Sequence, residues 1–180
     1  MIGAAAVPAT GVPSGMPIDT ASVANRRHLT FQTSREALSD AETLAAADRA
    51  GTLSPLGNWT LGQALGHCAS WIDYAYDGYP PELKAPWFVR IMVRLMKGSF
   101  LRKPLPSGFR IPRAPGGTFA TDVLPTEAGL ANFRQAWARL EREAPTMPSP
   151  VFGSLSHDEW RTMHLRHAEL HLSFFTAKQP

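Results

Sequence analysis

The sequence predicts an all-α protein, namely a four-helix bundle with a long crossover connection that carries an extra helix between bundle helices two and three. Three observations support this prediction. Apolar residues recur at helical spacing in several segments, helix-capping sequences precede three of these segments, and a long stretch rich in proline and glycine lies between the second and third of the bundle helices. Four helices with one long crossover form a common bundle topology.

The first two bundle helices are expected to begin at capping pairs. Thr33 and Glu36 can each satisfy a free backbone N–H at the start of a helix over residues 33–50, and Thr60 and Gln63 can do the same for the second helix. Glycines at 51 and 78 are plausible ends of the two helices. Their apolar residues recur at helical spacing: Leu38, Ala41, Leu44 and Ala45 in the first, and Leu61, Leu65, Cys68, Ile72 and Ala75 in the second.

The crossover helix is expected between Pro86, which suits a first turn, and Gly98, which suits an end. Apolar residues cover most of its circumference, so we expect it to pack across the bundle. Residues 99–125 have no periodicity and several prolines and glycines, which predicts a long connection. The apolar residues of the crossover helix are Trp87, Phe88, Ile91, Met92, Val93, Leu95 and Met96.

The last two bundle helices carry clear start signals. Thr126 can cap the third bundle helix, and Ser156 with Glu159 forms a capping box for the last, which should run from about His157 to Thr176. The third bundle helix has one apolar stripe, formed by Leu130, Phe133, Trp137 and Leu140.

Composition limits the class of protein. Of 180 residues, 44% are hydrophobic and 18% charged, which suits one folded domain and excludes a disordered chain. The single cysteine, Cys68, excludes an internal disulfide and favours a cytoplasmic location. The longest apolar runs are too short for a transmembrane segment. Residues 1–25 have neither basic residues nor a sustained apolar stretch, so we expect a flexible N-terminal tail without a secretory signal, and a bundle domain over residues 26–180.

Positive charge gathers between Glu82 and Arg113. This segment holds eight basic residues and one acidic residue, although the net charge of the whole chain is only +3. Such a field could attract an anionic ligand, nucleic acid or an anionic membrane surface, or it could be a solvated basic face. We rank nucleic acid and membrane last, because internal packing explains the apolar residues of the crossover helix, and we expect no nucleic-acid partner. The basic residues are Lys84, Arg90, Arg94, Lys97, Arg102, Lys103, Arg110 and Arg113.

Histidines suggest a metal site. His167 and His171 are one turn apart on the last helix, about 40° apart on one face, and this spacing can chelate one ion. His67 on the second helix completes a three-nitrogen set if the two helices face each other, although a lone histidine on a helix is more often a core or surface residue. His164 lies about 60° from His167 and could replace a ligand or support one, whereas Glu169 is rotated about 200° away.

Two further side chains share the face of His67. Gln63 and Tyr74 lie about 40° and 20° from it around the helix, and they could orient bound groups or simply pack. Cys68 is turned about 100° from His67, so we assign it to the core.

These residues resemble the DinB/YfiT-like superfamily of metalloenzymes, and within it a bacterial branch whose domain has no assigned function. The resemblance rests on Asn58-Trp59-Thr60-Leu61-Gly62-Gln63 before His67, and on Trp160 followed by His164-Leu-Arg-His167-Ala-Glu-Leu-His171-Leu-Ser-Phe174. It extends over residues 25–175. It implies a four-helix bundle in which His67, His167 and His171 bind zinc, nickel or another divalent ion with positions left open.

The resemblance leaves two classes of function. Some relatives are thiol-dependent transferases or isomerases, and many have no assigned reaction, so one class is a metal-dependent transferase or hydrolase acting on a small molecule or thiol. The other is a noncatalytic, metal-stabilised helical binding module. Neither class identifies a catalytic residue or a substrate, and both allow a homo-oligomer.

Overall fold

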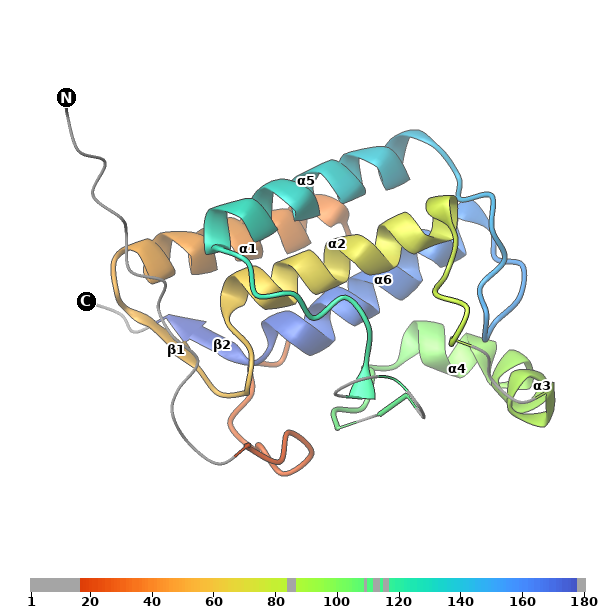
Figure 1. Ribbon diagram of the computed structural model, residues 1–180, viewed down its shortest axis with the longest axis horizontal. Coiled ribbons are helices and arrows are strands. Elements are labelled where there is room, and N and C mark those ends of the chain that lie inside the picture. The colour runs from red at the N-terminus through yellow and green to blue at the C-terminus, as the bar shows by residue number, and fades with distance from the viewer. Residues whose placement is uncertain (1–16, 84–86, 109, 112–113, 115–116, 178–180) are drawn as a thin grey trace.

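The computed structural model describes residues 17–83, 87–108, 110–111, 114 and 117–177 (Figure 1). Within them the protein is mostly helical, as the sequence predicts, with one small antiparallel sheet. The helices are α1 (Ser34–Arg49), α2 (Leu61–Asp77), α3 (Trp87–Leu95), α4 (Lys97–Arg102), α5 (Thr126–Arg142) and α6 (His157–Leu172), and the strands are β1 (Leu53–Pro55) and β2 (Phe175–Ala177).

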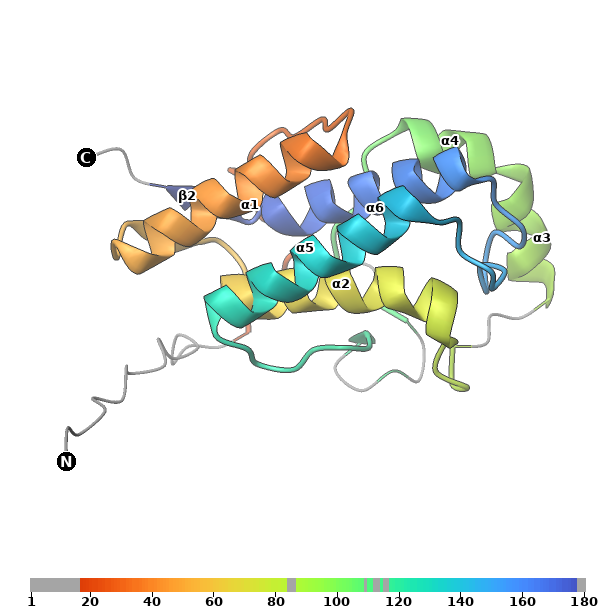
Figure 2. The same ribbon diagram turned by 90° about the horizontal axis from the view of Figure 1, so that it is seen from above.

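The long helices α1, α2, α5 and α6 lie side by side in both views (Figures 1 and 2). α2 packs against α5 and α6, and α1 packs against the same two helices. The short helices α3 and α4 lie at one end of this group, where α4 contacts α6. None of the helices among the described residues has both the length and the apolar character needed to cross a bilayer.

The three predicted capping pairs all start helices. The hydroxyl oxygens of Thr33, Thr60 and Ser156 accept hydrogen bonds from the N–H groups of Glu36, Gln63 and Glu159, respectively. Only the last pair is reciprocal, because the Glu159 carboxylate accepts a bond from the N–H of Ser156. The side chain of Gln63 instead reaches the segment that precedes α5.

The core forms where the apolar stripes of the long helices meet. The predicted stripe of α5, Leu130, Phe133, Trp137 and Leu140, is buried along its whole length. It joins one cluster with apolar residues of α1, α2 and α6, and Cys68 lies inside that cluster, as expected. Burial raises the pKa of the Cys68 thiol, which keeps it protonated and unreactive.

α2 and α5 approach each other at two glycines. A Cβ atom on Gly129 would overlap the carbonyl oxygen of Gly62, and a Cβ atom on Gly62 would overlap the carbonyl oxygen of Leu124. The absence of both side chains therefore lets the segment that leads into α5 lie directly on the N-terminal half of α2. This half of α2 also carries His67.

The prediction of one crossover helix ending at Gly98 is wrong. Met96 interrupts the helix: its N–H donates to the carbonyl of Met92 in α3, while its own carbonyl accepts from Ser99 and Phe100 in α4. Gly98 therefore lies within the first turn of α4. Pro86, the predicted start, is outside the described residues.

The prediction that this helix packs across the bundle is also wrong. No residue of α3 is buried, and its large apolar side chains are exposed. The physical reason lies in a contact with a residue distant in the sequence: Lys97 at the start of α4 forms an ion pair with Glu159 of α6, with 2.6 Å between Nζ and Oε1. Within α3 the least exposed residues are Val89 and Val93, whereas Arg90 and Arg94 are exposed.

The last helix is shorter than predicted, and a sheet follows it. α6 ends at Leu172 instead of Thr176, and Phe175–Ala177 pairs antiparallel with Leu53–Pro55, with Leu53 opposite Ala177 and Pro55 opposite Phe175. The N–H of Leu56 also donates to the carbonyl of Phe174. The local pattern around Phe174 does not reveal this partner, which lies more than a hundred residues earlier.

Two other expectations concern segment ends. Thr126 is the first residue of α5 and not its cap, since Pro125 occupies that position and the Thr126 hydroxyl bonds to the Asp48 carboxylate. Residues 1–16 of the predicted flexible tail lie outside the described residues. In the remainder, Ile18 exchanges two hydrogen bonds with the side chain of Asn58, at 2.7 and 2.8 Å.

Candidate metal centre

Two neighbouring helices supply the three histidines. His67 lies in the second turn of α2 and is buried, whereas His167 and His171 lie one turn apart on the face of α6 that meets α2. The start of each helix is set by its own cap, Thr60 for α2 and Ser156 for α6. Local capping and the packing of α2 on α6 therefore bring together residues a hundred positions apart.

The three rings point their Nε2 atoms at one another. Nε2 of His167 lies 3.2 Å from Nε2 of His67 and 3.0 Å from Nε2 of His171, and one nitrogen of each ring lies within 4.8 Å of the others. In a tetrahedral zinc site with Zn–N distances near 2.0–2.1 Å, neighbouring ligand nitrogens are about 3.3 Å apart. The measured spacing is thus close to that of ligands sharing one ion.

A backbone carbonyl fixes the tautomer of His67. Its Nδ1 lies 2.9 Å from the carbonyl oxygen of Phe119. Since a carbonyl can only accept, Nδ1 carries the proton and Nε2 presents its lone pair to the other two rings. A histidine ligand whose second nitrogen donates to a carbonyl is typical of metal sites, because this bond orients the ring and increases its basicity.

The segment 119–121 is itself held against α2. The Nε2 amide of Gln63 donates to the carbonyl oxygen of Thr121 at 2.8 Å, one turn before His67 bonds to Phe119. Ala120 between them has φ +55°, a left-handed conformation that costs a residue with a side chain about 1–2 kcal/mol. Gln63, for which the sequence left both orienting and packing roles open, thus bonds to the segment that contacts His67.

Two tryptophans border the histidines. Trp59 stacks on His171, with ring centroids 5.1 Å apart and planes at 6°, and meets His67 edge-on at 4.9 Å. Trp71 lies 5.9 Å from His67 and 5.8 Å from His167. Neither tryptophan was predicted to have a role at the site, although Trp71 follows His67 by four residues and hence shares its face of the helix.

Burial keeps the three rings neutral. It lowers the pKa of His67 to about 4, against the opposing effect of hydrogen bonds that the ring donates to the backbone at Phe119 and Ala120. Burial also holds the pKa of His167 and His171 well below the usual value, and the neighbouring histidines add to the effect. His167 and His171 retain partial solvent exposure while His67 is buried. The set thus offers three neutral lone pairs with one side open to small molecules.

The chain can be assigned to a family on its sequence. The sequence model of one family, described as "Protein of unknown function (DUF1569)", matches residues 23–178. The chain belongs to this family. The DUF1569 match spans every helix and strand of the structure and all three histidines, and it agrees with the expected domain of unknown function. No curated protein and no solved structure matches the chain.

His164 and Tyr74, the other possible supporting residues in the sequence of this DUF1569 protein, are not members of the three-histidine cluster. His164 is buried and stacked on Trp160, with ring centroids 5.7 Å apart, and burial lowers its pKa to about 3. Neither of its ring nitrogens has a hydrogen-bond partner among the described residues. Tyr74 packs against Trp71 and Tyr79, and burial together with the charge of Asp122 raises its pKa.

Glu169 lies on another side of α6, as its rotation predicts. It accepts a hydrogen bond from the N–H of Phe31 and forms an ion pair with Arg166 at 2.8 Å. His157 at the helix start contacts the carbonyl oxygen of Leu140. Neither residue belongs to the three-histidine cluster.

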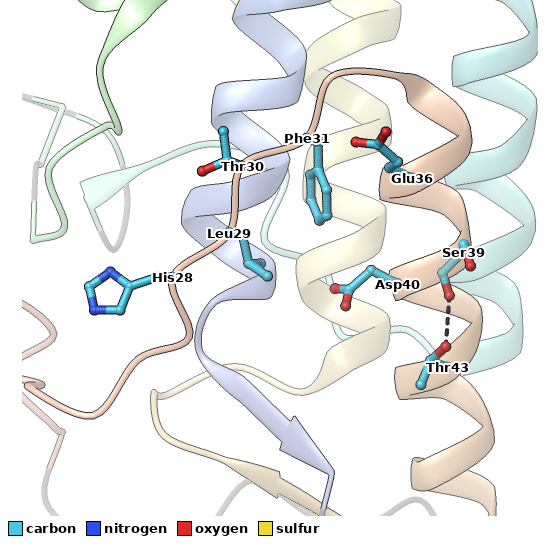
Figure 3. A pocket seen from close by; sticks show the side chains of 8 residues that line it. All are labelled: His28, Leu29, Thr30, Phe31, Glu36, Ser39, Asp40 and Thr43. Atoms are coloured by element: carbon cyan, nitrogen blue, oxygen red, sulfur yellow. Dashed lines mark hydrogen bonds between the residues drawn. The ribbon is translucent and has the colours of Figure 1, made fainter.

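An open hollow elsewhere on this DUF1569 domain does not offer comparable chemistry. It measures about 460 Å³ and lies between residues 28–31 and α1 (Figure 3). Its acidic side chains are already engaged: Asp40 pairs with Arg27, and Glu36 accepts from the N–H of Gln32. We therefore place the candidate functional site at the histidines.

Proposed function

We propose that residues 26–180 form a DinB/YfiT-like four-helix bundle domain in which His67, His167 and His171 bind one divalent metal ion, and that the protein is a metal-dependent transferase or hydrolase acting on a small molecule. The observation that carries the proposal is the convergence of three Nε2 atoms from α2 and α6. The side-by-side packing of α1, α2, α5 and α6 and the quoted sequence motifs support the superfamily assignment.

The donor set suits zinc or nickel. Imidazole nitrogens are preferred by zinc, nickel, copper and iron, and three of them leave at least one coordination position for another ligand. A bound divalent ion would lower the pKa of a coordinated water or thiol and would polarise a substrate oxygen. The partial exposure of His167 and His171 is consistent with access for such a molecule.

The residues around the histidines have defined tasks in this proposal. The carbonyl of Phe119 orients His67, and the stacked ring of Trp59 restricts the rotation of His171. Trp71 covers His67 and His167 and limits the water that can reach them. An aromatic border of this kind favours small substrates with an apolar part, including alkyl thiols.

A noncatalytic, metal-stabilised binding module is the second candidate. It is favoured by the origin of the ligands, since an ion shared between α2 and α6 would crosslink two helices of the core. Binding to the folded form alone would stabilise it as the metal concentration rises above the dissociation constant.

Metal analysis tests the common part of both candidates. We expect protein purified without a histidine tag to carry close to one zinc or nickel per chain, and chelation to lower its melting temperature. Replacement of His67, His167 or His171 by Ala, one at a time, should remove most of the bound metal. Chelation should then no longer lower the melting temperature. His28→Ala is the matched control, because His28 is exposed and lies outside the cluster. Full metal retention in His67→Ala would contradict the shared site.

Turnover separates the two candidates. Metal-loaded and chelated protein should be compared for transfer of a small thiol to a chromogenic electrophile and for hydrolysis of activated esters. A metal-dependent rate that is lost in His167→Ala would support the enzyme. Stoichiometric metal without any rate above the chelated control would support the binding module.

A further inference from the structure

α3 turns a continuous apolar face toward solvent. Five side chains of α3 and that of Met96, which follows it, form this face, and each is between 47% and 83% exposed, with Leu95 at 83% and Trp87 at 73%. At 100° per residue they cover about half of the helix circumference without interruption. The residues of this apolar face are Trp87, Phe88, Ile91, Met92, Leu95 and Met96.

The protein holds α3 in this orientation. The guanidinium group of Arg94 lies against the backbone at Gly153, in the loop before α6, and Lys97 forms its ion pair with Glu159. Both basic side chains thus point toward the body of the protein, and α4 packs on α6 beside them (Figure 2). The apolar face is left outward at one end of the molecule.

A face of this kind requires a partner. Soluble proteins rarely expose contiguous apolar patches of such extent without using them for binding. Elsewhere among the described residues, large exposed apolar side chains occur singly, at Ile18, Val123 and Met147. Only α3 collects them on one side of a helix.

We propose that the apolar face of α3 binds an anionic lipid surface, with the helix lying in the plane of the interface. Helices that bind membranes in this way combine Trp, Phe and Leu on one face with Lys and Arg on the other. Trp87 and Phe88 pack edge to face at the start of α3, and the indole of Trp87, apolar with one N–H donor, suits the headgroup region.

The charge around α3 favours an anionic partner. Arg90 is exposed on the helix itself, and Arg102 and Lys103 are exposed at the end of α4. Basic side chains beside a bilayer that contains anionic lipids each strengthen binding to it. The same charges oppose pairing with a second copy through this face, because a two-fold interface would bring like charges together.

Nucleic acid fits the face less well. Phosphate contacts need basic groups at the centre of the surface, whereas here the centre is apolar and the arginines lie at its border. Lipid binding therefore accounts for both the apolar centre and the basic border. It is independent of the metal proposal, since none of these side chains belongs to the histidine cluster.

Vesicle cosedimentation tests the inference with the full chain. We expect partition onto phosphatidylcholine vesicles containing phosphatidylserine, much weaker partition onto phosphatidylcholine alone, and a decrease as salt rises. Trp87 is the most exposed tryptophan of the described residues, so its fluorescence should shift to shorter wavelength on binding. Trp87→Phe should keep the partition and lose the shift.

Paired variants identify the binding element. Trp87→Ser combined with Leu95→Ser should lower partition onto the anionic vesicles by about tenfold or more, because two apolar side chains no longer enter the interface. Arg90→Glu should lower it too, and more strongly at low salt. Val123→Ser, which removes an equally apolar exposed residue outside α3, is the matched control and should bind as the original chain does.

Three results would overturn the proposal. The first is equal partition of the double variant and the original chain, and the second is no preference for anionic vesicles. The third is that the original chain does not bind vesicles but forms a concentration-dependent dimer or a salt-sensitive complex with DNA, and that the double variant loses this dimer or complex. That result would assign the face to a second copy or to nucleic acid. Unchanged melting temperatures of the variants would establish that each result concerns binding and not folding.

Discussion

α5 and α3 carry similar apolar stripes, yet they use them in opposite ways. The stripe of α5 is at most 2% exposed at any of its four large residues, whereas every large apolar residue on the outward face of α3 is at least 47% exposed. Both helices pair an apolar side with basic residues on the other side. The periodicity of a helix therefore predicts that it is amphipathic, but not which side meets the protein.

The difference does not arise from the ion pairs, because both segments pair with neighbouring helices. On α5, Arg134 pairs with Glu42 of α1 and Arg139 with Asp77 of α2, and the apolar stripe enters the core beside these helices. In the α3–α4 segment, Lys97 pairs with Glu159 of α6 and the guanidinium group of Arg94 lies near Gly153, and the large apolar side chains stay outside the core. The side of a helix that meets the protein is set by contacts with residues distant in the sequence, and the helix's own residues do not reveal these contacts.

The largest expected effect compares one tryptophan in each helix. Trp137→Ala should lower the free energy of unfolding by about 3–5 kcal/mol, because it leaves a large cavity in the core. Trp87→Ala should change it by no more than about 0.5 kcal/mol, since this side chain is exposed. Chemical denaturation of both variants measures the contrast, and similar losses would mean that α3 is buried in solution.

Acid should act on the interior histidines and not on α3, which has no histidine. Above pH 6.5 the His67 ring is neutral in both folded and unfolded chains. As the pH falls toward 4, the unfolded chain binds a proton that the folded chain excludes, because burial lowers the folded pKa to about 4. The metal-free protein should therefore lose roughly 3 kcal/mol of stability over this interval.

Denaturant unfolding of chelated protein at several pH values measures this slope. His67→Gln should make the slope less steep, because the variant lacks one of the four histidines whose pKa is lowered by burial. His28→Gln, at an exposed position, should retain it. A slope unchanged by His67→Gln would show that another group carries the acid sensitivity.

The smallest expected effect compares two glycines. Gly129→Ala should cost about 1–3 kcal/mol, because the new methyl group would overlap the backbone of Gly62 and force α2 and α5 apart. Gly98→Ala in α4 should be neutral or slightly stabilising, since its methyl group would meet only the flexible end of Arg102 and alanine favours helices. Thermal denaturation distinguishes the two, and a neutral Gly129→Ala would mean that the helices are less closely packed.

Most of the helical content could be predicted from the sequence, because capping pairs and apolar stripes are local signals. Thr33, Thr60 and Ser156 each start a helix, and the α5 stripe is buried as expected. The errors concern segments whose outcome depends on distant partners. The pairing of β2 with β1, which ends α6 early, and the outward direction of α3 both depend on residues far away in the sequence.

The candidate site also has a part that could be predicted from the sequence and a part that could not. The spacing of His167 and His171 is a helical property, and the structure brings His67 to them. The carbonyl of Phe119, in contrast, reaches His67 from a segment without periodicity, and it depends on the close contact of Gly62 with Leu124. The sequence left open whether Gln63 orients a bound group or packs, and its hydrogen bond to Thr121 could only be seen in the structure.

The two-stranded sheet limits how far the three histidines can move relative to one another, although none of them lies in the sheet. β1 lies six residues before α2, and β2 begins three residues after α6, so their pairing fixes how far one helix can slide along the other. A shift of a single residue along α6 would be about 1.5 Å. Metal–ligand distances are acceptable within only about 0.2 Å. The three residue pairs of this sheet thereby prevent α2 and α6 from sliding along each other, and they keep His67 aligned with His167 and His171.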